Sequence, residues 1–201
     1  VIQSSPARQP LPKPRRHLRA LMVGHLRAEK SPETYWAAAR RLAARADIRL
    51  DHIGDALDPA LAEAARACMA DCPHYRWLGA LPHAVTRRRI QQAHVLVHPS
   101  RLEGGAHVVI EAVSSGTPVL ASRIDGNLGL LGDDYAGGFD CGDDAALATL
   151  LQRCRDEPAM LPRLQVQCAA RAPLFAPDLE RASLHALMHR LLTHRLLETA
   201  P

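Results

Sequence analysis

Two carboxylates, Glu103 and Glu111, stand eight residues apart on either side of a Gly-Gly pair. Gly104 and Gly105 allow the backbone to bend sharply and to approach a ligand closely. Their N–H groups would lie near the positive end of the helix expected after them, which favours phosphate. Glu111 would lie at a different helical angle from the apolar residues around it, so it can face a crevice. The alternative is an ordinary helix-to-strand unit with two solvated glutamates.

The rest of the chain alternates short apolar runs with longer helical patterns. Such alternation favours right-handed crossovers and a parallel sheet with helices on both faces. We therefore predict a doubly wound, Rossmann-like α/β domain. Ligands bind such sheets outside the carboxyl ends of the strands. The loops expected there are 24–31, 54–58, 79–83, 99–106 and 122–132; the strands are 18–23, 48–54, 74–79, 94–100 and 116–122, and the helices include 31–46, with Ser31 as N-cap, 82–92, 158–171 and 178–197.

Composition narrows the classes of function. Aromatic residues make up only 3% of the chain, so a base-stacking nucleic-acid platform is not expected, and the net charge of +4 suits an anionic small ligand equally well. The five scattered cysteines indicate a reducing, cytoplasmic location. No apolar run is long enough to span a membrane. Because the chain begins at Val1, we expect a fragment of a longer protein.

Three segments are expected from the pattern. Residues 1–17 hold several prolines and no periodic apolar pattern, which predicts an interdomain linker. Residues 18–175 form the α/β domain, and residues 176–201 form a C-terminal helix. His185 and His189 lie four apart on that helix, but no acidic third ligand accompanies them, so we predict no metal site.

Several motifs together resemble one protein family. The order VGHLRAEK, WLGALPH, VLVHPSRLEGGAHVVIEAVSSGTPVLAS, IDGN and GGFDCGDDAALATLL is similar to the C-terminal, donor-binding half of retaining GT-B glycosyltransferases. The hallmark of that class is Glu, seven residues, Glu. The resemblance implies a nucleotide-sugar donor as substrate, no tightly bound cofactor and no required metal. It also implies an N-terminal acceptor-binding domain as the partner of this chain.

The resemblance assigns roles to matching positions. Glu103 would lie beside the donor sugar, Glu111 would accept hydrogen bonds from the ribose hydroxyls, and Lys30 would neutralise the donor diphosphate. Glu103 and Lys30 are thus the expected catalytic residues. The remaining residues expected at the nucleotide sugar are Gly24, His25, Arg27, Gly79, Leu81, Gly104, Gly105, Ala106, Gly126 and Asn127, with the loop from Gly79 to Pro82 reading the base.

Several positions depart from the family pattern. The family commonly has Arg directly after the glycine that ends the first strand, whereas this chain has His25. Phosphate stabilisation at neutral pH then depends on protonation of His25 or on Arg27. After Glu103, a small residue, Phe and Gly are replaced by Gly104, Gly105 and Ala106, followed by His107. Because of these changes, the family pattern does not identify the donor sugar.

The motifs GHLRAEK, EGGAHVVIEA and SRIDGN look most like the selenosugar synthases of selenoneine biosynthesis, which join the sugar of a UDP-sugar to selenophosphate. The function implied is retaining glycosyl transfer from a UDP-sugar, with selenophosphate as acceptor. Two alternatives stay open at this point. One is a GT-B-like module that binds a nucleotide or a partner protein without chemistry, and the other is a GT-B-fold sugar-nucleotide epimerase.

Overall fold

The computed structural model describes residues 8–14 and 16–198. Within these ranges, six parallel strands form one sheet in the order β3-β2-β1-β4-β5-β6. The reversal of strand order beside β1 is typical of a doubly wound fold, which confirms the predicted Rossmann-like α/β class. The strands are β1 (Leu18–Val23), β2 (Ile48–Ile53), β3 (Tyr75–Trp77), β4 (Val95–His98), β5 (Val119–Ser122) and β6 (Gly138–Phe139).

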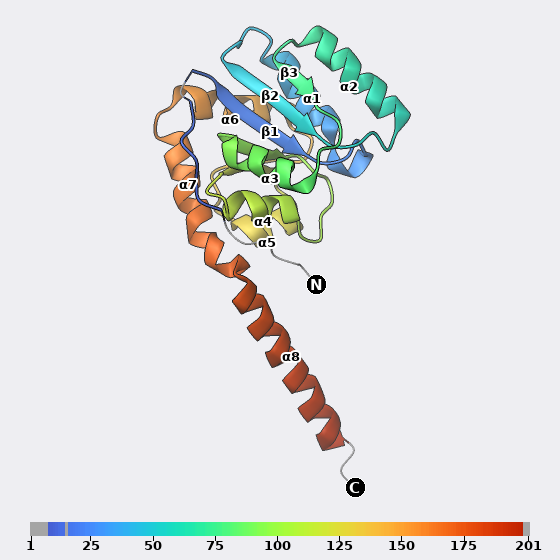
Figure 1. The fold of residues 1–201 in the computed structure, drawn as a ribbon, viewed down its shortest axis with the longest axis vertical. Helices are drawn as coiled ribbons and strands as arrows, with labels where there is room; N and C mark the ends of the chain where they lie inside the picture. Colours follow the sequence, from blue (N-terminus) through green and yellow to red (C-terminus); the bar gives the residue numbers. More distant parts are fainter. Residues whose placement is uncertain (1–7, 15, 199–201) are drawn as a thin grey trace.

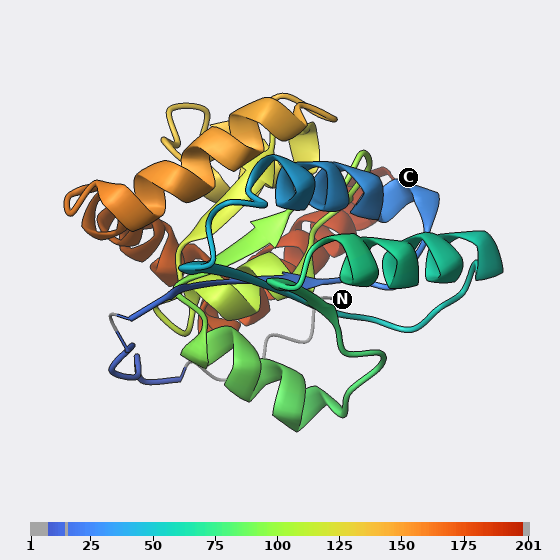
Figure 2. The same ribbon diagram turned by 90° about the horizontal axis from the view of Figure 1, so that it is seen from above.

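Helices cover both faces of this sheet (Figures 1 and 2). One face carries α1 (Pro32–Arg41), α2 (Pro59–Asp71) and α6 (Asp144–Asp156), and α1 contacts both of the others. The opposite face carries α3 (His83–Gln92), α4 (His107–Val113) and α5 (Asp125–Leu131), packed in that order. Helix α7 (Met160–Arg171) contacts α4, α5 and α6. The central strands are therefore enclosed from both sides.

Burial on both faces explains why the central strands read as continuous apolar runs. All four residues of β4 are buried, and so are all four of β5. The helices contribute single apolar faces, such as Val109, Ala112 and Val113 of α4. The core thus fixes the register of the strands, and with it the positions of the loops that follow them.

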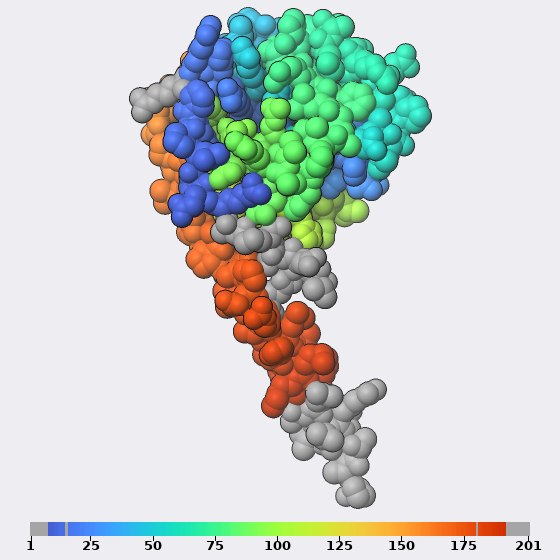
Figure 3. Space-filling model, viewed as in Figure 1, coloured from blue at the N-terminus to red at the C-terminus, as the bar shows by residue number. Residues whose placement is uncertain are grey.

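The segment before β1 lies against the domain. Residues 8–14 form neither helix nor strand, and Figure 3 shows this dark blue segment on the surface beside the green atoms of α3. The side-chain amide of Gln91 donates to the carbonyl of Gln9. Lys13 Nζ donates to Thr117 Oγ1 at 3.3 Å, and burial lowers the pKa of Lys13 to about 8. These contacts attach the segment near the amino-terminal edge of the sheet.

The C-terminal part extends away from the body (Figure 1). A 3-10 turn (Ala172–Phe175) leads into α8 (Pro177–Glu198), whose described side chains are all exposed. None of the helices in the described ranges combines the length and apolar character that a bilayer span requires. Residues 1–7 and 15 of the predicted linker 1–17, and residues 199–201 of the predicted C-terminal segment 176–201, lie outside the described residues. The division into linker, domain 18–175 and C-terminal helix stays a prediction.

Several local predictions differ from the structure, and the helix expected over 31–46 ends at Arg41. The expected loop 122–132 contains the helix α5, although its glycines lower helix propensity. Tertiary contacts offset that cost, because the guanidinium of Arg171 donates to the carbonyls of Leu130 at 3.0 Å and Gly129 at 2.8 Å. Ser31 stands before α1 but does not cap it through its side chain, since its φ of 48° is left-handed.

Candidate functional site

A cleft of about 390 Å³ opens at the carboxyl ends of the strands. Its walls come from the loops after β1, β2, β3 and β4 and from the first turn of α4. This is the edge of the sheet at which the sequence predicts ligand binding. Of the predicted site residues, Gly24, His25, Arg27, Lys30, Leu81, Glu103, Gly105 and Ala106 line the cleft.

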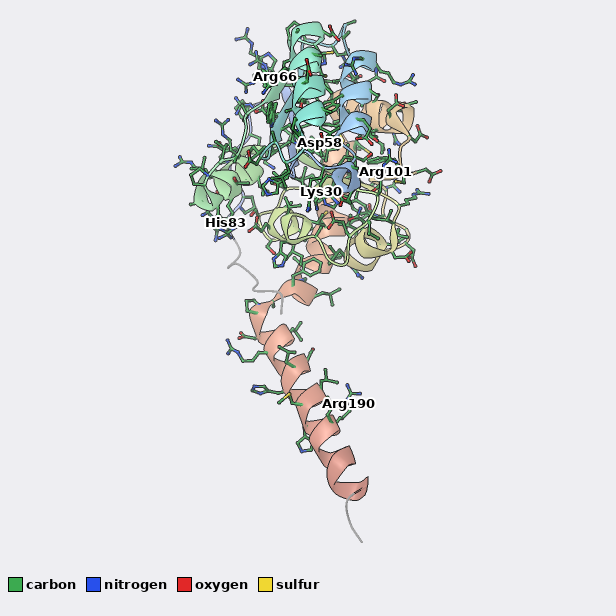
Figure 4. All side chains as sticks on the ribbon, turned by 90° about the vertical axis from the view of Figure 1, so that its right-hand side faces the viewer. Lys30, Asp58, Arg66, His83, Arg101 and Arg190 are labelled. Atoms are coloured by element: carbon green, nitrogen blue, oxygen red, sulfur yellow. The ribbon has the colours of Figure 1, made fainter. Side chains whose placement is uncertain are left out.

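Lys30 enters the cleft from a short 3-10 turn (Ala28–Lys30) that follows β1. The stem of the lysine passes over Gly24, where an added Cβ would stand 3.4 Å from Lys30 Cδ. The ammonium forms an ion pair with Glu103 Oε1, and the two side chains are 19% and 12% exposed. Figure 4 shows Lys30 within the body of the domain, near the strand-end loops. The two predicted catalytic residues are therefore in direct contact.

Glu103 is held in its ionised form. Burial favours the neutral carboxyl, but hydrogen bonds from His98, Lys30 and Ser100 outweigh burial and lower the pKa of Glu103 to about 2. His98 Nε2 lies 3.4 Å from Glu103 Oε1. Lys30, His98 and Ser100 surround the carboxylate, and its charge is fixed at neutral pH.

The first turn of α5 stands directly behind Glu103. A Cβ added at Gly126 would lie 2.1 Å from the carbonyl oxygen of Glu103, so only glycine permits this approach. The next residue, Asn127, is 1% exposed. Its Oδ1 lies 3.1 Å from His98 Nδ1, and its Nδ2 donates to the carbonyl of Ser122 at 2.9 Å. The side chain of Asn127 thus points at the residues that support Glu103, and its predicted contact with the nucleotide sugar stays a prediction.

His25 and Arg27 line the cleft from the loop after β1. The backbone N–H of Asp55 donates to His25 Nδ1 at 2.9 Å. Nδ1 therefore acts as an acceptor, and a neutral His25 carries its hydrogen on Nε2. Because of this tautomer, His25 can donate one hydrogen bond to an anion without becoming charged.

The chain bends at Gly104, as the sequence predicts for the Gly-Gly pair. Neither Gly104 nor Gly105 has a left-handed φ, whereas Gly79 in the predicted base loop does, at 68°. A Cβ at Gly104 would meet no atom within 4 Å. The bend therefore needs no left-handed glycine, and the small residues leave room beside the first turn of α4, which begins after Ala106.

Glu111 faces outward from α4 toward α3. His83 Nε2 lies 2.6 Å from Glu111 Oε1, and Arg87 Nε lies 3.8 Å from the same oxygen. The side chain of Glu111 is 13% exposed, but that of His83 is 68% exposed. Figure 4 shows His83 at the periphery of the body. One of the two partners of Glu111 is thus at the protein surface.

A directed chain of hydrogen bonds lies under the cleft. Burial lowers the pKa of His52 to about 4, so its ring is neutral at neutral pH. Its Nε2 lies 3.0 Å from the carbonyl of Gly24 and must donate to it, which leaves Nδ1 to accept from the Tyr75 hydroxyl at 3.1 Å. That hydroxyl accepts from Trp36 Nε1 at 2.7 Å. The chain connects α1, β3 and β2 with the end of β1.

Sequence reasoning gave no functional role to His98 or His83. Both lie where strands end or helices begin at this edge, His98 as the last residue of β4 and His83 as the first residue of α3. That position was the available signal. His94, at the start of the same strand, lies at the opposite edge and bonds backbone groups of Arg19 and Pro14.

No group of three metal-ligating side chains occurs in the part of the chain that the structure describes. The cleft contains one lysine, one exposed arginine and two histidines. Side chains of these types can bind an anion such as a diphosphate without a metal ion. That no metal and no tightly bound cofactor are needed stays a prediction.

The fold occurs in solved glycosyltransferases. Sucrose-phosphate synthase from Thermosynechococcus elongatus superposes with a TM-score of 0.75 at 24% identity, over 90% of this chain and 47% of that one. The α,α-trehalose 6-phosphate synthase from Burkholderia multivorans gives 0.78 at 15% identity, over 92% and 45%. This chain therefore matches less than half the length of each protein, and the likeness is one of fold.

Curated relatives match part of the sequence. The D-inositol 3-phosphate glycosyltransferases of Streptomyces coelicolor and Streptomyces avermitilis are 39% identical over 87 residues, which is 43% of this chain and 19% of theirs. The family described as glycosyl transferases group 1 matches residues 4–172. Because this match covers most of the chain, including Lys30, Glu103 and Glu111, the chain belongs to the glycosyl transferases group 1 family.

Proposed function

We propose that this chain binds a UDP-sugar as the donor-binding part of a retaining glycosyltransferase and that the acceptor is selenophosphate. One observation carries the proposal: Lys30, Glu103 and the first turn of α4 converge on a single cleft. A diphosphate next to Lys30 and the amino end of α4 would be neutralised by a mobile ammonium and by backbone N–H groups. The sugar would then lie beside Glu103.

The reaction we propose breaks the bond between the anomeric carbon and the diphosphate. UDP leaves with the electron pair, and the ammonium of Lys30 and the Nε2–H group of His25 stabilise the developing negative charge. The selenium of selenophosphate attacks on the face that UDP vacates, so the configuration is retained. Glu103, already ionised, accepts hydrogen bonds from the sugar and fixes its orientation.

The acceptor proposal is supported by the motifs shared with selenosugar synthases. A curated relative named for D-inositol 3-phosphate is consistent with an anionic acceptor. The acceptor site would belong to an N-terminal domain of the same polypeptide. The five free cysteines fit a reducing cytoplasm, which is where we propose that the protein acts.

The reaction is tested with full-length protein, a panel of UDP-sugars, and selenophosphate present or absent. Release of UDP that requires selenophosphate and yields a selenium-containing sugar supports the proposal. Conversion of the UDP-sugar without any acceptor would instead establish an epimerase. Binding without any conversion would establish a module that has no chemistry.

The donor site is tested separately by calorimetry of UDP with the 201-residue chain. We expect weak binding in the millimolar range or better, and a loss of about tenfold or more in Lys30→Ala, because one charge-assisted hydrogen bond is removed. The matched control is Arg88→Ala, an exposed cation on α3 away from the cleft. Absence of UDP binding at millimolar concentration would refute the donor assignment.

A further inference from the structure

A buried histidine stands behind Glu103 with its tautomer fixed. His98 is 2% exposed. Asn127 uses its amide nitrogen on the carbonyl of Ser122, so its oxygen is the atom that faces His98 Nδ1 at 3.1 Å. An amide oxygen only accepts, so Nδ1 carries a hydrogen in every charge state. The atom of His98 that can gain or lose a proton is therefore Nε2.

Nε2 has two partners that suit its two states. It lies 3.3 Å from Ser100 Oγ and 3.4 Å from Glu103 Oε1. A neutral ring accepts from the Ser100 hydroxyl, whereas a protonated ring donates to Glu103. No heavy atom has to move between these arrangements, because Asn127 holds the ring in place.

Glu103 Oε1 is also the atom that Lys30 contacts. The proposed donor site asks Lys30 to bind the diphosphate, and a flexible lysine stem that is 19% exposed can turn toward it. Glu103 is only 12% exposed, so losing the ammonium would leave a poorly solvated carboxylate. A second cationic partner at the same oxygen removes that penalty.

We propose that His98 takes up a proton at Nε2 when a UDP-sugar binds and replaces Lys30 as the charged partner of Glu103. The inference rests on the proposed donor-binding function and makes His98 a positioning residue. The proton comes from solvent, and only the N–H bond forms. The charged group facing His98 is Glu103, with Lys30 beyond it, while α5 and β5 present the neutral side chains of Asn127 and Ser122.

Proton uptake is measured by calorimetry of UDP-glucose with the 201-residue chain at pH 7, in two buffers of different protonation enthalpy. We expect net uptake by the wild type and almost none by His98→Asn, whose amide keeps the Nδ1 position but leaves nothing at Nε2. His98→Gln places a neutral donor near Nε2, so we expect the affinity to recover within a few-fold without proton uptake. Equal uptake by all three proteins would overturn the proposal.

A second measurement needs no ligand. Carboxyl carbon resonances report the titration of Glu103, and we expect His98→Asn to raise the pKa of Glu103 above its value of about 2. The control is His94→Asn, which changes the other histidine flanking the same strand without touching the cleft. An unchanged Glu103 titration in His98→Asn overturns the proposal. Failure of UDP-glucose to bind the wild type would instead refute the donor-binding function, so the two failures are distinguishable.

Discussion

Glu103 and Glu111 are almost equally exposed, at 12% and 13%, but their surroundings differ. Glu103 is contacted by Lys30 from the loop after β1 and by His98 at the end of β4. Glu111 is contacted by His83 and Arg87, both from α3. Two separate elements, with α5 behind them, therefore hold the first carboxylate, whereas one helix holds the second.

This difference indicates that Glu103 is held rigidly, whereas the surroundings of Glu111 are adjustable. Buried partners whose own side chains are bonded hold a carboxylate in one orientation before any ligand arrives. A partner that is 68% exposed, as His83 is, exchanges with water and can be displaced by a ribose hydroxyl. Substitutions near Glu103 should therefore cost more than those near Glu111.

The largest effect is expected from Gly126→Ala, since the new Cβ would overlap the carbonyl of Glu103. We expect the free energy of unfolding to fall by about 1–3 kcal/mol and UDP-glucose binding to weaken with it. Gly129→Ala, in the same helix with open space around it, is the matched control and should stabilise by about 0.5–1 kcal/mol. Denaturant unfolding measures both. Equal effects at the two glycines would show that the contact behind Glu103 is not restrictive.

The next effect concerns acid stability. The pKa of Glu103 is about 2 in the folded protein, below its ordinary value of 4.5. Its contribution to stability is therefore present above pH 4.5 and is lost as the pH falls from 4.5 toward 2. We expect Glu103→Gln to have a flatter stability profile than the wild type in this window. Parallel profiles in urea unfolding across that range would contradict the ionised, paired state of Glu103.

A smaller effect is expected from Glu111→Gln. If Glu111 binds the ribose hydroxyls, the wild type should prefer UDP over 2′-deoxy-UDP, and the variant should lose about tenfold in UDP affinity together with that preference. Glu63→Gln, an exposed position on α2, is the control. Calorimetry with the two nucleotides measures the preference. A preference that survives in Glu111→Gln would mean that the ribose is bound elsewhere.

The smallest effect is expected from His83→Ala. Its exposed contact with Glu111 is worth about 1 kcal/mol or less, so UDP affinity should change by no more than about fivefold. A drop of about tenfold or more would break the contrast between the two carboxylates, since the exposed contact with His83 would then matter as much as the contacts around Glu103.

The sequence predicted the sheet well because its signals are local. Strand 18–23 agrees with β1 residue for residue. Helix α2 begins at Pro59, a favourable first position, and Asp58 Oδ1 caps it by accepting from Ala60 at 2.9 Å. The position of the cleft could be predicted because open α/β sheets bind ligands at the carboxyl ends of their strands. Helix α5 could not be predicted, because a carbonyl cap from Arg171, 41 residues from Leu130, offsets its glycines.

The pairings within the site were beyond the sequence for a similar reason. Lys30 and Glu103 are 73 residues apart, and His98 and Asn127 are 29 apart, so their contacts depend on the packing of the whole sheet. His98 and His94 look alike in the sequence because both flank the same apolar run. Only the parallel topology assigns one to the cleft and the other to the opposite edge.

The hydrogen-bond chain from Trp36 to the carbonyl of Gly24 has a fixed polarity, because the indole only donates and the carbonyl only accepts. Because of this hydrogen-bond chain, the loop that carries His25 is sensitive to substitutions far from the cleft. Replacing Trp36 by Phe would leave the Tyr75 oxygen without its donor, and the loss would be transmitted through His52 to the loop that carries His25. Residues that contact no ligand, such as Trp36, therefore help to hold the loop of this cleft in place, as the residues that line it do.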